Sequence, residues 1–210
     1  MKAVSDYEAI CGTNRGEMTL KGSRFIGVAM PCNDEMSIQN NLRQIEIEYR
    51  NATHYCWAAV YDGPERKERS SDNGEPSGTA GKPILAVVKG TGLTNIMVVV
   101  IRYFGGTLLG TGGLVHAYSE AAKISVTGID RRKLIACAVY RFTLDYSYYS
   151  VFESKCRDMM ARKPECDYYD KVDVKVWVGF SRSEEFEKRI TDLTERHVRL
   201  VRDADEYIQS

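Results

Sequence analysis

Apolar residues in the first part of the chain occur in short runs between turn formers, and one run is wholly apolar. Ile96–Ile101 holds six apolar, mostly β-branched residues without a polar position. Such a run predicts a strand that is buried on both faces of its sheet. Two further strands are predicted at residues 19–30 and 54–61, where β-branched and aromatic residues are bounded by turn signals.

Helical spacing appears in three other stretches of this first part. Ile38, Leu42, Ile45 and Tyr49 form one apolar face, and Asn33 or Asp34 is expected to cap a helix that runs to about Arg50. A short helix is predicted over Ile84–Lys89, with Ser77 or Thr79 as its cap. A third helix, which should end near Gly128, presents a face of small and apolar residues: Leu114, Ala117, Tyr118, Ala121 and Ser125.

The polar segment Asp62–Pro83 separates the second predicted strand from the short helix. It is rich in charged residues and turn formers, which predicts a long loop or a hairpin tip. Loops of this length in compact domains are commonly functional.

The last third of the chain has its own pattern. Residues 136–145 and 172–180 alternate as half-buried strands do, and 166–169 and 198–202 predict shorter strands. Helices are predicted at 149–162, buried through Phe152, Cys156 and Met159, and after a capping box of Ser181 and Glu184. The resulting order is β-α-β-β-α-β. The charged residues 130–133 mark a boundary, so we expect an α+β protein with domains at 1–130 and 134–210.

Glycines are concentrated directly after the apolar strand, where Arg102, Tyr103 and Phe104 lead into five glycines: Gly105, Gly106, Gly110, Gly112 and Gly113. Two phosphate-binding fingerprints fail in the chain. Before Gly81-Lys82 the Walker pattern meets Pro76 instead of glycine, and a dinucleotide fingerprint starting at Gly110 meets Val115 at its third glycine. Neither cofactor is therefore expected.

Composition and charge narrow the possible classes of protein further. Lys plus Arg and Asp plus Glu both total 29, which argues against nucleic-acid binding by bulk charge alone. The six cysteines form no C-x-x-C pair and the amino terminus lacks a signal-peptide pattern, so we expect reduced thiols in the cytoplasm. No apolar run is long enough to cross a membrane. His54 and Cys56 share a strand face, but they lack a second ligand pair and no metal site is expected.

Four long motifs resemble the IMPACT/YigZ family, in the form of its bacterial two-domain members. They are SRFIG, HYCWAAV, SSDNGEPSGTAGKPIL and VVVIRYFGGTLLGTGGLVHAY, within residues 19–128. The resemblance implies an amino-terminal domain similar to the second domain of a small-subunit ribosomal protein and to domain IV of elongation factor G. It also implies a ferredoxin-like carboxy-terminal domain, a cytosolic location and a link to RNA or ribosomes. Asn73 and His116 depart from the family, which commonly has Asp and Arg there.

Three classes of function remain open. The first is an RNA- or ribosome-associated binding protein linked to translation regulation. Its phosphate and base contacts would come from Arg24, Lys82, Arg102, Tyr103 and Phe104 with the backbone of the five glycines. A second binding surface is predicted on the open face of the small sheet, from Arg141, Lys175 and Trp177. The alternative for Trp177, of about equal weight, is a dimer contact or partial cover by a terminus.

The second class is an enzyme that acts on a phosphorylated or nucleotide substrate. Asp72, Glu75 and His116 would then transfer protons while Arg102 and Lys82 bind phosphate. The third class is a protein-binding module in stress or translation control. Both site hypotheses require that Asp72, Glu75, Arg102 and His116 converge, and we expect the Ser71–Lys82 loop to lie beside Arg102.

Overall fold

The computed structural model describes residues 6–62 and 66–209, which form two compact units. The N-terminal unit is Glu8–Arg132, and the C-terminal unit starts at Lys133 and includes the described residues before Glu8. The charged residues at this boundary do not form a loop, because strand β7 (Arg131–Leu144) begins with them.

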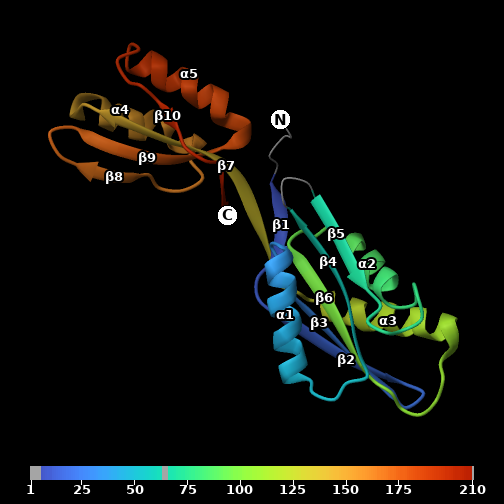
Figure 1. The fold of residues 1–210 in the computed structure, drawn as a ribbon. Coiled ribbons are helices and arrows are strands. Elements are labelled where there is room, and N and C mark those ends of the chain that lie inside the picture. Colours follow the sequence, from blue (N-terminus) through green and yellow to red (C-terminus); the bar gives the residue numbers. More distant parts are fainter. Residues whose placement is uncertain (1–5, 63–65, 210) are drawn as a thin grey trace. The chain divides into compact units, whose positions relative to one another are not determined.

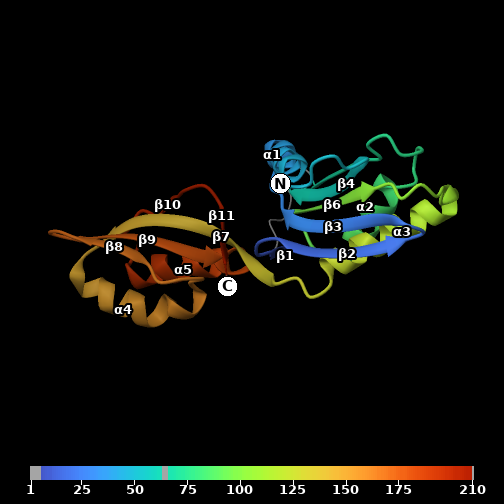
Figure 2. The same cartoon turned by 90° about the horizontal axis from the view of Figure 1, so that it is seen from below.

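The N-terminal unit is a five-stranded antiparallel sheet with helices on both faces (Figures 1 and 2). In spatial order its strands are β2 (Asn14–Leu20), β3 (Ser23–Pro31), β6 (Ile96–Tyr103), β4 (His54–Asp62) and β5 (Arg66–Ser71). Helix α1 (Glu35–Glu48) covers one face, while α2 (Gly81–Gly90) and α3 (Gly110–Val126) cover the other. Strand β6 is central and buried on both faces, as its apolar run predicts.

Two strands of this sheet differ from the prediction. The single strand predicted at 19–30 is a hairpin, because Lys21 and Gly22 both have positive φ angles, 47° and 81°, and turn the chain from β2 into β3. Strand β5 forms inside the segment predicted as a long loop or a hairpin tip, and it pairs antiparallel with β4. Its charged sequence, RKERSS, suits an edge strand, where charges discourage pairing with other chains.

The helix ends in this unit confirm one predicted cap and exclude another. Asp34 caps α1 by accepting the Ser37 N–H at 2.7 Å, in a capping box that Ser37 completes. Neither Ser77 nor Thr79 caps α2, whose N-cap residue is Ala80. The last helix, α3, ends shortly before Gly128, which has a φ of 69°.

The C-terminal unit shows the predicted β-α-β-β-α-β order. After β7 come α4 (Tyr146–Cys156), β8 (Glu165–Tyr168), β9 (Val172–Gly179), α5 (Ser183–Leu193), and a last strand in two pieces, β10 (Val201–Arg202) and β11 (Glu206–Gln209). Single turns of 3₁₀ helix, η1 (Arg157–Met159) and η2 (Phe180–Arg182), follow α4 and precede α5. The sheet order is β8-β9-β7, with β10, β11 and β1 (Tyr7–Ile10) also paired to β7.

The core of this unit lies between the sheet and its two helices, and it contains the alternating residues that the sequence predicts, from Ala138 to Leu144 and from Val172 to Val178. Phe152, Cys156 and Met159 pack on it from the α4 side. The predicted capping box of Ser181 and Glu184 is wrong, because α5 begins at Ser183 with Arg182 as N-cap and no side-chain cap. No described helix is long and apolar enough to cross a membrane.

Candidate functional site

Arg102, near the carboxyl end of β6, lies where three strands of the sheet meet. It pairs with His54 at the start of β4 and with Phe25 near the start of β3. Side chains alternate along a strand, so Arg102 faces α2 and α3 while Tyr103 faces α1. Arg24 also lies on the α1 side, where Tyr49 and Tyr103 are its electrostatic neighbours. The predicted cluster of Arg24, Arg102, Tyr103 and Phe104 is therefore divided between the two faces of the sheet.

A buried ion pair connects β6 to the segment before α2. Arg102 Nη1 lies 2.6 Å from Glu75 Oε1, and the two residues are only 5% and 8% exposed. The Tyr118 hydroxyl of α3 donates to the same Glu75 oxygen at 2.7 Å. This brings the Ser71–Lys82 segment beside Arg102, as expected from the sequence. In the low-dielectric interior, these contacts of Glu75 with Arg102 and Tyr118 hold β6, α3 and the Ser71–Lys82 segment in one geometry.

Two more side chains complete this polar cluster. His54 Nε2 lies 3.8 Å from Glu75 Oε1, while its Nδ1 donates to the Asn73 carbonyl at 2.8 Å. Cys56 Sγ donates to the Asp72 carbonyl at 2.9 Å. Burial raises the pKa of Cys56 to about 12, so the thiol is protonated at neutral pH and is no nucleophile. His54 and Cys56 thus help to fix the segment from Asp72 to Gly74.

Tyr118 and Ser23 are members of the cluster that sequence reasoning missed. The helical spacing places Tyr118 only on the apolar face of its helix. A buried tyrosine hydroxyl needs a hydrogen-bond partner, however, and that need is the signal in the sequence that could have identified it. The Ser23 hydroxyl accepts from Arg102 Nη2 at 3.4 Å and from the Gly105 N–H at 3.2 Å. Its role depends on contacts between residues about eighty positions apart, which the sequence pattern does not show.

Arg102 is stacked between two aromatic rings. Its Cζ lies 5.3 Å from the ring centroid of Phe25 and 5.4 Å from that of Phe104. Among the residues that the structure describes, its Nε has no hydrogen-bond partner. The guanidinium is buried and paired with Glu75, which does not suit the predicted role of Arg102 as a phosphate ligand. It instead supports the ring of Phe104, which is 46% exposed.

Asp72 caps α2 from a distance in sequence. Oδ1 accepts the N–H groups of Ala80 and Gly81 at 2.9 and 2.8 Å, and Oδ2 accepts that of Gly78 at 2.8 Å. Burial alone would raise the pKa of Asp72, but these hydrogen bonds outweigh burial and the pKa is lowered. Lys82, exposed in the first turn of α2, acts in the same direction. The carboxylate is thus fully engaged, which does not suit the predicted role in proton transfer.

His116 does not join the cluster. It is exposed on α3, and its charge acts on Glu120, one turn further along the same helix. In the described parts of the chain it makes no ion pair or hydrogen bond with Asp72, Glu75 or Arg102. Of the three predicted proton-transfer residues, Glu75 alone contacts Arg102, so the convergence that both site hypotheses require is not present, and neither the enzyme site nor the RNA site forms with the predicted set of residues.

The five predicted glycines have different roles. A Cβ atom on Gly105 would lie 2.0 Å from the Gly22 carbonyl carbon, so Gly105 permits the β2–β3 turn to pack against the end of β6. Gly106, Gly110 and Gly112 have open space around them. Within the described chain, no side chain caps the start of α3 and no acidic residue lies in its first turn. The Gly105 N–H donates to Ser23, whereas the first N–H groups of α3 receive no side-chain cap in the described chain.

The second predicted surface is not an open platform. Trp177 is 1% exposed, it packs with Ile208 of the last strand, and its Nε1 donates to Glu206 at 2.7 Å. Arg141 pairs with Asp203. Trp177 does lie on the sheet face away from the helices, but the end of the chain covers it. Trp177 is therefore not available on an open face, whereas the Arg141 side chain is exposed.

Comparison with known proteins agrees with this architecture. Residues 21–126 match the Impact N-terminal domain. The chain is 33% identical to the IMPACT family member YvyE of Bacillus subtilis, over 91% of this chain and 88% of that protein. It is 30% identical to the IMPACT family member YigZ of Escherichia coli, over 87% and 90%. A crystal structure described as a hypothetical protein aligns with a TM-score of 0.67 at 26% identity, over 97% of this chain and all of that one. The chain belongs to the IMPACT family.

Proposed function

We propose that this protein binds single-stranded RNA at the end of β6, with Phe104 as a base-stacking residue. One observation carries the proposal: a half-exposed aromatic ring lies over a buried arginine that is itself fixed by Glu75. Aromatic rings that are held rigidly at a surface stack on bases at little entropic cost, and each such contact contributes about 1–3 kcal/mol.

The backbone beside Phe104 suits a phosphate group. The start of α3 is uncapped, its first turn holds Gly110 and Gly112, and neither glycine has a Cβ that would keep a ligand away. N–H groups at a helix start attract anions through the helix dipole. Because the chain has no net charge, we expect few phosphate contacts and therefore a shallow dependence of affinity on salt.

The link to translation rests on the family resemblance, which implies that the N-terminal domain is similar to ribosomal and elongation-factor domains. We propose that the RNA is one that such domains meet, in a ribosome or in its substrates. Arg102, which is buried and paired with Glu75, packs against the Phe104 ring and supports it. Leu108 is 84% exposed and adds apolar surface to the proposed site.

Replacing Phe104 with alanine should weaken binding of a fluorescently labelled oligouridine by about five- to a hundredfold, as expected for loss of one base stack. Phe104→Trp should retain the affinity, because its ring also stacks. The measurement is fluorescence anisotropy at several salt concentrations. The slope against salt should not change, since Phe104 neutralises no phosphate.

The matched control is Ile47→Ala, which removes an exposed apolar side chain from α1 on the other face of the sheet. It should leave the affinity unchanged. Circular dichroism of each variant confirms that the fold is retained. Equal affinities of wild type and Phe104→Ala for oligouridine would refute the proposed site.

A further inference from the structure

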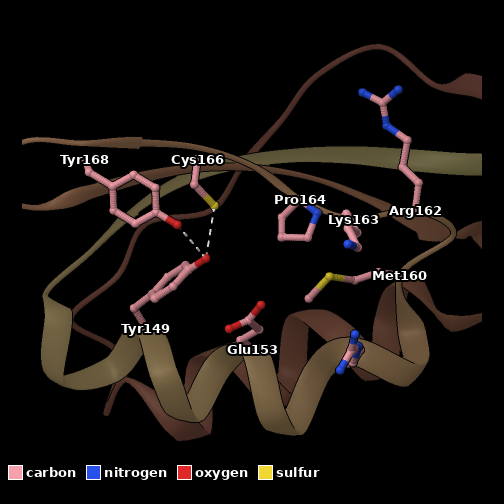
Figure 3. Close-up of a pocket in the computed structure, with 9 residues that line it drawn as sticks. Tyr149, Glu153, Met160, Arg162, Lys163, Pro164, Cys166 and Tyr168 are labelled. Carbon is pink, nitrogen blue, oxygen red and sulfur yellow. Dashed lines mark hydrogen bonds between the residues drawn. The ribbon is translucent and has the colours of Figure 1, made fainter.

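The C-terminal unit contains a pocket of about 490 Å³ that no part of the proposed RNA site uses. It lies between α4 and the segment that leads from η1 into β8 (Figure 3). Its volume falls within the range of small-molecule sites, roughly 300–1,000 Å³. Nine residues line it: Tyr149, Glu153, Arg157, Met160, Arg162, Lys163, Pro164, Cys166 and Tyr168.

Two of the three cations in this lining are free to bind an anion. Arg162 is occupied, because it pairs with Glu165 and its Cζ stacks 3.4 Å from the Trp177 ring centroid. In Figure 3 its side chain points away from the pocket. The side chains of Arg157 and Lys163, in contrast, make no ion pair or hydrogen bond within residues 6–62 and 66–209. Two unpaired cations beside one cavity favour a doubly charged anion such as a phosphate monoester.

One acceptor in the pocket is also free. Glu153 projects from α4 into the space below Lys163 and Pro164 (Figure 3), and no described residue pairs with its carboxylate. A lone carboxylate would repel a bare anion, so its presence beside two cations favours a ligand that carries hydroxyl or amino donors as well. Carboxylates that hydrogen-bond ribose hydroxyls are common in nucleotide sites.

The remaining walls are aromatic and apolar. The hydroxyls of Tyr149 and Tyr168 lie 2.9 Å apart, and their rings meet edge to face at 5.8 Å. Hydrogen bonds with Cys166 and then with Tyr168 raise the pKa of Tyr149, which keeps the phenol neutral. Met160 and Pro164 add apolar surface. The planar ring of a ligand can therefore pack against the two tyrosine rings and form hydrogen bonds at its edge with their hydroxyl groups.

We propose that this pocket binds a nucleoside monophosphate, whose phosphate contacts Arg157 and Lys163 and whose sugar hydroxyls donate to Glu153. The base then packs against the tyrosine wall. With two free cations and one carboxylate, the lining matches a ligand that has an anionic end and a neutral, donor-rich remainder. The site lies within the C-terminal unit, so it stands independently of RNA binding at Phe104.

Isothermal titration of the full chain tests this with three probes: adenosine monophosphate, adenosine and inorganic phosphate. The nucleotide should bind, and the other two should bind at least tenfold more weakly, because each makes only part of the contacts. Arg157→Gln and Lys163→Gln should each weaken nucleotide binding about tenfold. Lys155→Gln is the control, since Lys155 is exposed near the end of α4 but does not line the pocket.

Several outcomes would overturn the proposal. Absence of binding at millimolar nucleotide would do so, as would an equal loss of affinity in the Lys155→Gln control. Inorganic phosphate that binds as tightly as the nucleotide would reduce the pocket to a simple anion site. A short RNA whose binding depends on Arg157 and exceeds that of the mononucleotide would assign the pocket to a longer strand instead. All three substituted side chains are exposed, so the variants should fold normally.

Discussion

Replacing Glu75 with leucine should lower the free energy of unfolding by about 3–5 kcal/mol, because it leaves the buried guanidinium of Arg102 without a counter-charge. The same range is expected for Arg102→Leu, which strands the Glu75 carboxylate. Both partners are almost fully buried, and the Glu75 oxygen also accepts the Tyr118 hydroxyl. Urea denaturation followed by tryptophan fluorescence measures the loss, since Trp57 lies in β4 of the same unit.

The double variant Glu75→Leu/Arg102→Leu distinguishes an ion pair from simple packing. It should be more stable than either single variant, because no buried charge is left unpaired. Glu48→Gln is the control: it breaks the exposed pair with Arg15 and should cost less than about 1 kcal/mol. A double variant whose loss equals the sum of the two single losses would contradict this account. The single variants should also weaken RNA binding, since the Phe104 ring loses its support.

Asp72→Ala is expected to have the second largest effect, a loss of about 2–3 kcal/mol at pH 7. The substitution leaves three backbone N–H groups around the start of α2 without an acceptor. It also frees the segment that carries Glu75. Thermal and urea unfolding of the variant and the wild type provide the measurement.

The dependence of this effect on pH has a definite sign. The folded state lowers the pKa of Asp72 below the unfolded value of about 3.9, so its stabilising contribution is complete above that pH. The contribution is lost as the pH falls through the lower, folded-state pKa. The difference between wild type and Asp72→Ala should therefore be constant from pH 7 to pH 5 and shrink below about pH 4. The control is Asp130→Ala, which should show neither effect, because Asp130 is an exposed aspartate of the same unit whose side chain has no hydrogen bond with any residue that the structure describes. A difference in unfolding free energy between wild type and Asp72→Ala that is as large at pH 3 as at pH 7 would contradict the role of Asp72 as a helix cap.

The sequence pattern is sufficient for most of the elements because periodicity reports burial directly. The run Ile96–Ile101 and the alternating valines from Val172 to Val178 appear as buried strands in the structure. The pattern failed for β5, whose charged residues carry no strand period, and for the turn at Lys21-Gly22 inside an apparently continuous run. Edge pairing and tight turns depend on backbone partners, which hydrophobic spacing does not encode.

For the candidate site, the sequence by itself determined the segments: the strand at Ile96, the glycines after it and the motif that carries Asp72 and Glu75. It did not determine which side chains are exposed and available to a ligand, because that depends on burial and on pairing with other residues. The tertiary structure paired Arg102 with Glu75, assigned Asp72 to a helix cap, left His116 in solvent and covered Trp177 with the end of the chain. Each outcome follows from contacts between residues distant in sequence, where the cost of an unpaired buried charge or N–H group selects the partner.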